Sequence, residues 1–153
     1  MSHVSTLKVH GFHLDLYGHV NNARYLEFLE EARWNFLDDA GSLPWFMAHG
    51  YLLVVSRIAI DYLRPAGMGD VLRIETRLAG LERRSGRIAQ TIRRADNNKV
   101  VVSAEITFAV LHPQQRGALP IEGEIAEHLL RGAATPDHPD HGRPATAHGE
   151  TAC

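Results

Sequence analysis

Apolar residues recur at three- and four-residue steps in one stretch of the chain, residues 23–40. The residues at this spacing are Tyr25, Phe28, Leu29, Ala32, Phe36 and Leu37, and such a period is typical of a helix with one buried face. Asn21-Asn22 supplies a helix N-cap, and Gly41 fits the glycine that follows a last helical turn. The pattern predicts one long amphipathic helix.

Alternating apolar and polar positions predict strands in most of the remaining chain. The expected strands are Gly50 to Pro65, Val71 to Ala79, Gly86 to Arg94 and Val100 to Val110, with a short first strand from Leu7 to Phe12. In the strand after Gly50, the residues expected on one face are Leu52, Val54, Ile58, Ile60 and Tyr62. Asp96-Asn97-Asn98 indicates a hairpin turn, and Ile121 to Leu130 fits a short second helix.

This order of elements favours one fold. A single long helix cannot cover a sheet of four or five strands unless the sheet curls around it. We therefore predict an α+β fold, in which a curled antiparallel β-sheet wraps around one long central helix. The apolar surface that this helix leaves uncovered is expected to be buried against a second copy of the chain.

Composition narrows the class of protein. The chain has 153 residues, a length that suits one domain. Its net charge of −2 excludes a generally basic nucleic-acid binder. Its apolar runs are too short for a membrane span. No signal peptide is visible and the single cysteine is Cys153, so a cytoplasmic protein is the default expectation.

The last 22 residues differ from the rest. Residues 132–153 are rich in proline and histidine and hold almost no large apolar side chain, so we expect a disordered tail after a domain of residues 1–131. His138 and His141 are spaced as a metal-binding pair, but two ligands in a tail are a weak signal.

The segment from His13 to Tyr25 carries the best candidate chemistry. It places a carboxylate, two imidazoles and a glycine immediately before a helix N-terminus, where unpaired N–H groups could hold a carbonyl oxygen that becomes negative. Asp15 could attack that carbonyl or activate a water. An alternative is that Asp15 and His19 only fold the loop and Asn22 only caps the helix. A metal site at His13, Asp15 and His19 is a third interpretation.

At this segment the sequence resembles a known family. Residues 15–34, with Tyr62 to Ala66, Arg84 to Gly86, Ala104 to Phe108 and Leu119 to Glu124, are similar to the hotdog acyl-CoA thioesterases of the 4-hydroxybenzoyl-CoA thioesterase-like branch, particularly the bacterial long-chain acyl-CoA thioesterase III group. The resemblance covers residues 7–131. It implies a hotdog fold, a homodimer or dimer of dimers, and thioester hydrolysis without a metal or other cofactor.

The resemblance also implies roles for individual residues. Asp15 matches the catalytic carboxylate, and the segment Gly18 to Tyr25 matches the helix start that faces the thioester. The candidate catalytic residues are therefore Asp15, Gly18, His19 and Asn22. Many relatives have a second acidic residue at the position of His13, so the role of His13 stays open.

Several residues are candidates for contacts with the substrate. A basic rim would attract the phosphates of CoA, and five arginines lie within twelve residues: Arg83, Arg84, Arg87, Arg93 and Arg94. This segment also fits an ordinary solvated hairpin. The candidate binding residues in it are Arg84, Ser85, Gly86 and Arg87. The further candidates are Tyr17, Tyr25, Arg57 and Arg64, although Arg57 could simply interact with Asp61 on the same strand face.

An acyl chain would need an apolar groove, and the residues that could line it, or else simply belong to the core, are Tyr25, Phe28, Leu29, Trp34, Phe36, Trp45, Phe46 and Met47. Trp45-Phe46-Met47 is expected in a loop, where core burial is less automatic.

The leading hypothesis is an enzyme that hydrolyses fatty acyl-CoA, with long chains favoured, to fatty acid and CoA. The alternatives are a thioesterase for acyl carrier protein or aromatic acyl-CoA, and a non-catalytic module that binds acyl-CoA. Asp15 favours catalysis, because a binding module gains nothing from a carboxylate near a thioester.

Overall fold

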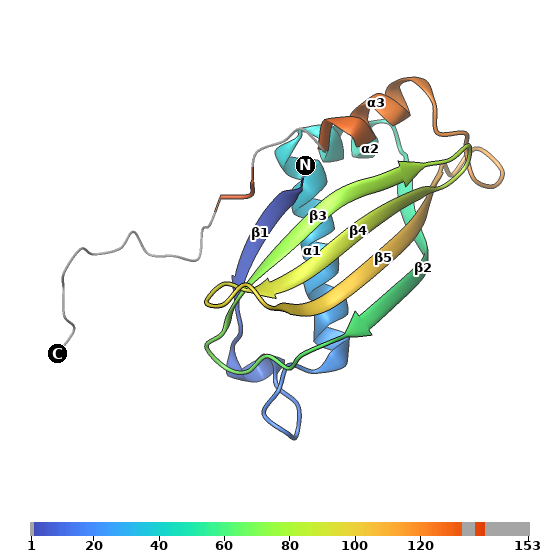
Figure 1. The fold of residues 1–153 in the computed structure, drawn as a ribbon. Coiled ribbons are helices and arrows are strands. Elements are labelled where there is room, and N and C mark those ends of the chain that lie inside the picture. The colour runs from blue at the N-terminus through green and yellow to red at the C-terminus, as the bar shows by residue number, and fades with distance from the viewer. Residues whose placement is uncertain (1, 133–136, 140–153) are drawn as a thin grey trace.

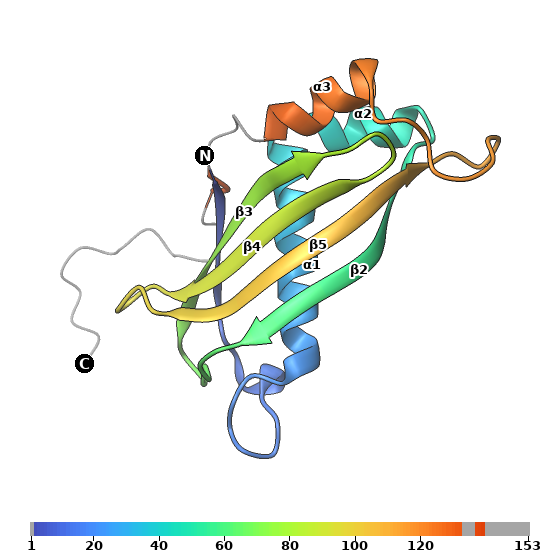
Figure 2. The same ribbon diagram turned by 45° about the vertical axis from the view of Figure 1, so that its right-hand side comes forward.

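The computed structural model describes residues 2–132 and 137–139, and its centre is an antiparallel sheet curled against one long helix (Figures 1 and 2). Among these residues, five strands pair in the order β1-β3-β4-β5-β2, all antiparallel. The elements are β1 (His3–Lys8), the 3₁₀ turn η1 (Gly11–His13), α1 (Asn22–Asp39), α2 (Ser42–Ala48), β2 (Leu52–Tyr62), β3 (Val71–Leu81), β4 (Gly86–Arg94), β5 (Val100–Leu111) and α3 (Gly123–Gly132). The predicted α+β hotdog architecture is confirmed.

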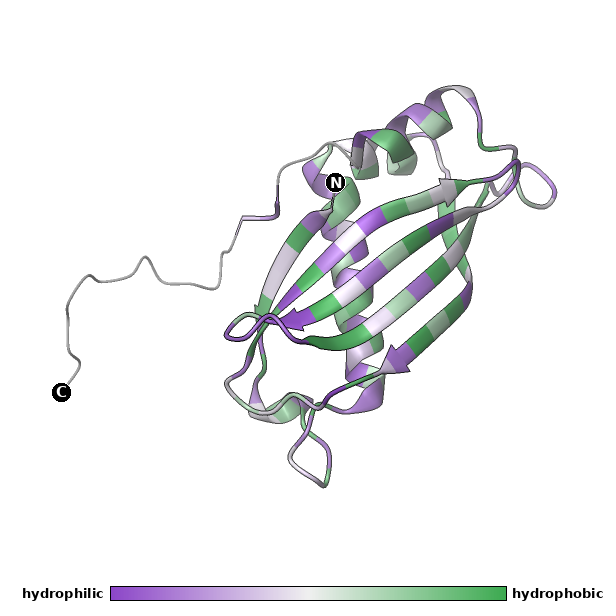
Figure 3. Ribbon diagram, in the orientation of Figure 1, coloured by the Kyte–Doolittle hydropathy of each residue, from purple (hydrophilic) through white to green (hydrophobic). Residues whose placement is uncertain are grey.

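Helix α1 supplies one side of the core. The six apolar residues at helical spacing are all buried, as predicted, and they pack on the inward residues of β3, β4 and β5, whose alternation is visible in Figure 3. One buried polar side chain ties the two layers together: Gln90 of β4 donates hydrogen bonds to the Leu29 carbonyl and to Thr76 Oγ1, each at 3.0 Å. Its satisfied amide fixes the helix on the sheet.

The expected face of β2 is wrong at its beginning. The register with β5 shifts between Val55 and Arg57, which is a β-bulge that adds one residue to β2. Before the bulge, Leu53 and Val55 therefore lie opposite the inward residues Val110 and Phe108, and the expected Leu52 and Val54 lie on the outer face. After the bulge, Ile58, Ile60 and Tyr62 lie on the inner face as predicted.

The first strand also differs from its prediction. Residues 3–8 form β1, which pairs with β3, whereas Gly11–His13 forms η1. The buried positions of β1 include His3 and Ser5, so its inward face does not alternate in hydrophobicity and gives no strand signal. The chain then leaves the sheet at Val9, whose N–H and carbonyl bond the backbone of Asp70 and Gly69.

The segment after α1 is helical. Gly41 ends α1 with φ of +71°, as expected of a glycine in that position, but Trp45-Phe46-Met47 belongs to α2 rather than to a loop. Phe46 is buried and Met47 is exposed. The predicted second helix is confirmed as α3, which begins two residues later than expected and packs against α2.

Residues 137–139 lie against the outer edge of β1. The His138 N–H donates to the Val4 carbonyl at 2.9 Å, and the Val4 N–H donates to Asp137 Oδ1 at 3.0 Å. His138 and the buried His3 both contact the Asp39 carboxylate, at 2.9 and 2.8 Å. Burial raises the pKa of Asp39, but these two imidazole hydrogen bonds outweigh it and leave the pKa below its usual value. His141 and the rest of the predicted tail lie outside the described residues, so tail disorder stays a prediction.

Candidate active site

The loop of residues 14–20 projects from the end of the sheet where α1 begins (Figures 1 and 2). Leu14 and Val20 form a β-bridge at its base. Inside that base the Asp15 N–H donates to the His19 carbonyl at 2.8 Å. Gly18 turns the chain with φ of +76°, which glycine adopts without strain. The loop is therefore a tight hairpin, and Asp15 begins its turn.

The two oxygens of the Asp15 carboxylate differ. Oδ1 accepts hydrogen bonds from the backbone N–H groups of Tyr17, at 2.9 Å, and His19, at 3.3 Å. Oδ2 makes no hydrogen bond within the described residues. Because the loop backbone orients the half-buried carboxylate through one oxygen, the second oxygen is left to act on a water or a substrate.

The N-terminus of α1 follows directly, and Asn21 caps it. Asn21 Oδ1 accepts a hydrogen bond from the Ala23 N–H at 2.9 Å. The expectation that Asn22 caps the helix is therefore wrong, since Asn22 is the first helical residue. Within the described part of the chain the Asn22 N–H has no hydrogen-bond partner, and it lies at the positive end of the helix dipole.

The tip of the loop is highly exposed. The exposed fractions of Leu16 and Tyr17 are 92% and 79%, and His19 is exposed as well. Large exposed apolar side chains beside a candidate site are typical of a surface that a ligand or a second chain covers.

His13 has a local structural role. Its ring packs edge-on against Phe28, with centroids 4.9 Å apart, and its Nδ1 accepts the His10 N–H at 2.9 Å. Burial, followed by the charges of His10 and Arg24, lowers the pKa of His13. Within the described residues, no group of three His, Cys, Asp or Glu side chains is arranged to hold a metal ion, and His13, Asp15 and His19 do not form one.

Tyr25 and Tyr62 lie side by side near the start of α1. Their ring centroids are 5.7 Å apart, and the Tyr62 hydroxyl donates to the Asn22 carbonyl at 3.1 Å. Burial raises the pKa of Tyr25 to about 12, against a smaller lowering by the Ala66 backbone. Tyr62 was not among the expected site residues, although it begins one of the stretches that carry the family resemblance.

The candidate arginines are spread over the molecule. Arg64 lies at the Asp15 end of the sheet and donates to the Val100 carbonyl at 2.7 Å. Arg57 lies on the outer face of β2 and forms no ion pair with Asp61 or another described residue. The alternative in which Arg57 simply interacts with Asp61 therefore has no support among the described residues.

Arg84, Ser85, Gly86 and Arg87 lie at the other end of the sheet, around the turn between β3 and β4. At about 3.3 Å per residue, β4 separates its two ends by roughly 26 Å, so within one chain this turn is remote from Asp15. Arg84 donates to the Ala118 carbonyl at 2.7 Å, and Arg87 lies near Glu82 and Glu105. Gly86 is buried where a Cβ atom would overlap the Phe108 ring.

An apolar groove of about 290 Å³ lies between α1 and the β2 side of the sheet. Trp34, Leu37, Leu53, Val55, Ile106 and Phe108 are among its lining residues. Trp34 was an expected acyl-chain contact. Leu53 and Val55 were not expected, because the bulge places them, rather than Leu52 and Val54, on the inner face of β2. The groove adjoins the half of α1 that is farther from Asp15.

A sheet curled around one helix, with a carboxylate in the loop before that helix, defines a hotdog protein of the thioesterase type. The model of the thioesterase-like superfamily matches residues 10–129, and the chain belongs to that superfamily. Among curated proteins, the long-chain acyl-CoA thioesterase FadM of Escherichia coli (strain K12) is 47% identical over 123 residues, which are 80% of this chain and 93% of FadM. The expected family is confirmed.

Two solved structures show the same fold. YbaW, a probable thioesterase from Escherichia coli, superposes with a TM-score of 0.80 at 44% identity, over 86% of this chain and 98% of YbaW. Slr0204, a 1,4-dihydroxy-2-naphthoyl-CoA thioesterase from Synechocystis, has a TM-score of 0.75 at 18% identity, over 94% of this chain and 100% of Slr0204. The second likeness supports the fold alone. Among the described residues, no helix is long and apolar enough to cross a membrane.

Proposed function

We propose that this chain hydrolyses long-chain fatty acyl-CoA to fatty acid and CoA, with Asp15 as the catalytic carboxylate. One observation carries the proposal: Asp15 Oδ1 is held by two loop amides, while Oδ2 has no partner in the described part of the chain. The long-chain preference rests on the similarity to FadM. We also place the reaction in the cytoplasm, as the sequence suggests.

The helix start would stabilise the charge that develops on the substrate. When a thioester carbonyl is attacked, its oxygen becomes negative, and a backbone N–H at a helix N-terminus is suited to hold it. The Asn22 N–H is our candidate donor, which gives Asn22 a role through its backbone rather than its side chain. Gly18 and His19 serve by setting the geometry of the loop.

Two routes use the same carboxylate. As a general base, Asp15 takes a proton from water while the water oxygen bonds to the carbonyl carbon, and the C–S bond then breaks to release CoA. As a nucleophile, Asp15 Oδ2 bonds to that carbon itself, releases CoA, and leaves an acyl-enzyme for water to cleave. Rapid-quench detection of an acyl-enzyme distinguishes the two routes.

We further propose that the site is completed by a second copy of the chain. Among the described strands, β2 pairs with β5 on one side only, and edge strands with exposed apolar residues favour pairing. If two β2 strands met antiparallel across a two-fold axis, the Arg84 end of one chain would approach the Asp15 end of its partner. Arg84 and Arg87 could then bind CoA phosphates, and the groove beside β2 could take the acyl chain.

Replacement of Asp15 by Asn tests the proposal. Asparagine keeps an Oδ1 that accepts from Tyr17 and His19 but replaces the unpartnered Oδ2 with an uncharged NH₂ group. Because a positioned general base contributes about 10²–10⁴ in rate, kcat for palmitoyl-CoA should fall by that factor while the melting temperature holds. Thiol release measures kcat, and calorimetry measures stability.

His19→Ala is the matched control, because His19 contributes to the loop through its backbone and the variant keeps Asp15. It should lose much less activity than Asp15→Asn. Full turnover by Asp15→Asn would overturn the carboxylate mechanism. If the wild-type protein binds palmitoyl-CoA without cleaving it, the binding-module alternative holds instead. If it cleaves only acyl-acyl carrier protein or only aromatic acyl-CoA, the substrate must be reassigned.

A further inference from the structure

The segment of residues 66–70 is packed alongside the Asp15 loop. Its Ala66 carbonyl accepts the Val20 N–H at 2.8 Å, and Gly67 forms a β-bridge with His19. The backbone of His19 thus lies between Gly67 on one side and Asp15 on the other. A displacement of Gly67 would therefore move the residue that orients the Asp15 carboxylate.

Gly67 is itself held by Asp70. The Gly67 N–H donates to Asp70 Oδ2 at 2.8 Å, and the Asp70 N–H returns a bond to the Gly67 carbonyl at 3.1 Å. Between them, Met68 is 71% exposed and Gly69 has φ of +85°. The Val9 backbone also holds this turn, because its carbonyl accepts the Gly69 N–H at 2.9 Å and its N–H donates to the Asp70 carbonyl at 2.8 Å. The Gly67 N–H, which lies next to His19, is held by the Asp70 carboxylate.

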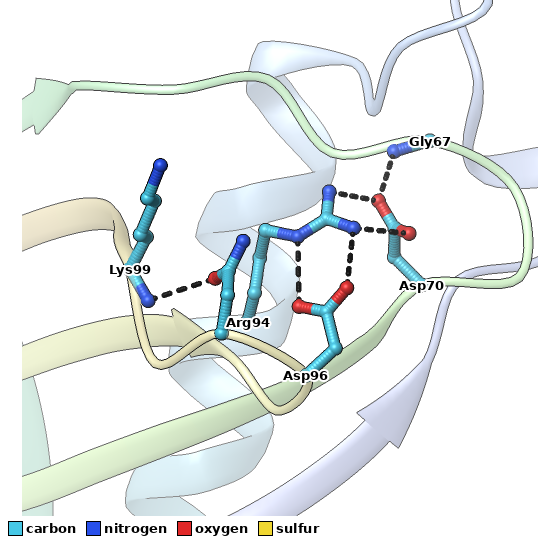
Figure 4. Close-up of polar contacts among 6 residues, drawn as sticks. Gly67, Asp70, Arg94, Asp96 and Lys99 are labelled. Carbon is cyan, nitrogen blue, oxygen red and sulfur yellow. Dashed lines mark hydrogen bonds and ion pairs between the residues drawn. The ribbon is translucent and has the colours of Figure 1, made fainter.

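Arg94, at the end of β4, forms a bidentate ion pair with the Asp70 carboxylate (Figure 4). Its Nη1 donates to Asp70 Oδ2 at 2.8 Å and its Nη2 to Asp70 Oδ1 at 3.0 Å. Nε and Nη2 also donate to Asp96, at 3.1 and 3.0 Å. Two carboxylates on one planar guanidinium fix its orientation more strictly than one could. The side chains of Arg94 and Asp70 are 25% and 21% exposed, so the pair is partly shielded from solvent.

A neighbouring ion pair provides a comparison. Arg93 lies on the opposite face of β4 and donates to Glu75 at 3.1 Å, with side-chain exposures of 30% and 33%. Arg93 joins β4 to Glu75 within β3, whereas Asp70 precedes β3. Within the described residues, the hydrogen bonds of the Arg93 side chain go to Glu75 and to the Asn98 carbonyl and not to the turn at Gly67. An ion pair such as Arg93–Glu75 is sufficient to link β4 to β3. Linking the strands therefore does not require the contact with the turn at Gly67 that the Arg94–Asp70 pair makes.

We propose that Arg94 and Asp70 are positioning residues for catalysis, which act through Gly67 and His19 to hold the Asp15 carboxylate in its reactive orientation. We call these two residues the Arg94–Asp70 clamp. The proposal rests on the proposed function, because it assigns the clamp a role in the reaction of Asp15. It extends the active site from the loop to the end of β4.

Kinetics of clamp variants test the role. Misplacement of a reacting group by about 1 Å can cost on the order of 10²-fold in rate, so Arg94→Gln and Asp70→Asn should lower kcat by about tenfold to a hundredfold with KM little changed. Arg94→Lys keeps the charge without the fork and should recover part of this loss. The control Arg93→Gln should keep its kcat, although it removes a comparable ion pair.

Hydrogen exchange provides a readout independent of turnover. The amides of Tyr17, His19 and Gly67 should exchange faster in Arg94→Gln and Asp70→Asn than in the wild type, and Arg93→Gln should leave them unchanged. Asp15→Asn keeps the Oδ1 acceptor and the clamp, so it should lose turnover without faster exchange at Gly67.

The outcomes separate the two proposals. If Asp15→Asn is inactive while folded Arg94→Gln and Asp70→Asn match the kcat of Arg93→Gln, the clamp role is wrong and the proposed function stands. If Asp15→Asn keeps full turnover, acyl-CoA hydrolysis stands but Asp15 is not its catalytic carboxylate, and the clamp is refuted as well because its role is to hold that carboxylate. If Arg94→Gln does not fold, Arg94→Lys and Asp70→Asn decide by the same measurements.

Discussion

At the scale of single residues, two adjacent asparagines have different tasks. The Asn21 side chain closes the first turn of α1 through the Ala23 N–H, whereas Asn22 presents its backbone N–H at the helix start. An N-cap asparagine is worth about 1 kcal/mol relative to alanine. The two positions can therefore be separated by their effects on stability.

Asn21→Ala should lower the free energy of unfolding by about 1 kcal/mol, measured by urea denaturation. Asn22→Ala should change it by less than about 0.5 kcal/mol, as is usual for an exposed substitution away from a cap, and should keep turnover because the backbone N–H remains. Equal losses of stability at the two positions would contradict the assignment of the cap.

At the scale of elements, α2 and α3 are joined by a stack of rings. The imidazole of the buried His128 lies on the indole of Trp45, with centroids 4.1 Å apart and planes 18° from parallel. His128 Nδ1 has no hydrogen-bond partner within the described residues. Burial lowers the pKa of His128, the charge of Arg131 lowers it further, and Glu124 and Glu127 oppose this. The folded protein thus favours neutral His128.

The contact between α2 and α3 should therefore be sensitive to acid. An unfolded histidine takes up its proton at a pH of about 6.5, above the pH at which folded His128 does so. As the pH falls through this range, the unfolded chain binds more protons than the folded protein does, so the free energy of unfolding falls.

His128→Phe should reduce that loss of stability, since phenylalanine keeps a flat ring on Trp45 and cannot titrate. Thermal melts at pH 8 and pH 5 measure the loss in each protein. Part of the loss should remain, because the pKa of His13 is also lowered. An identical acid-induced drop in the wild type and His128→Phe would exclude His128 as the cause.

Local pattern predicted the elements that have a continuous apolar stripe. Helix α1 extends over five turns and its spacing is unambiguous, and β3 to β5 alternate cleanly. The sequence does not reveal the extra residue in β2, because a bulge shifts the alternation without changing the composition. Helix α2, with seven residues, has too few turns for a period to show.

The candidate site was predictable where it is local and not where it depends on strand pairing. Asp15, Gly18 and the helix start are adjacent in sequence, so their association follows from the chain itself. The clamp joins residues 24 positions apart, and five arginines that are close in sequence, at positions 83, 84, 87, 93 and 94, are divided between the two ends of β4. The predicted strand from Gly86 to Arg94 already separates the arginines at its two ends, whereas the contact of Arg94 with Asp70 depends on the pairing of β3 with β4.

At the scale of the whole molecule, the separation of Asp15 from Arg84 leads to a test of the proposed dimer. Asp15→Asn should lack the catalytic carboxylate, and the double variant Arg84→Glu, Arg87→Glu should have a raised KM for palmitoyl-CoA. In the proposed dimer each site combines Asp15 of one chain with Arg84 and Arg87 of its partner. In a mixed dimer of the two variants, one site would therefore carry all the substitutions and the other site would carry none.

Co-expression of the two variants should therefore restore activity. With random pairing of a two-fold dimer, about a quarter of all sites are intact, whereas separately purified variants added together without subunit exchange should show only the sum of their residual activities. The measurement is kcat/KM at low salt, with tagged chains to isolate mixed dimers. Absence of recovery in isolated mixed dimers would place Arg84 and Asp15 in independent roles.

The contact of residues 137–139 with β1 bears on how far such an assembly can grow. A sheet with two bare edges could recruit copies at both sides and extend into a filament. Here the N–H and carbonyl of Val4 on the outer edge of β1 are already bonded to Asp137 and His138. Pairing through β2 would therefore leave β1 as the edge at each end of the joined sheet, with its Val4 position already bonded. This contact disfavours the addition of a further chain at that position, and with it growth beyond two chains.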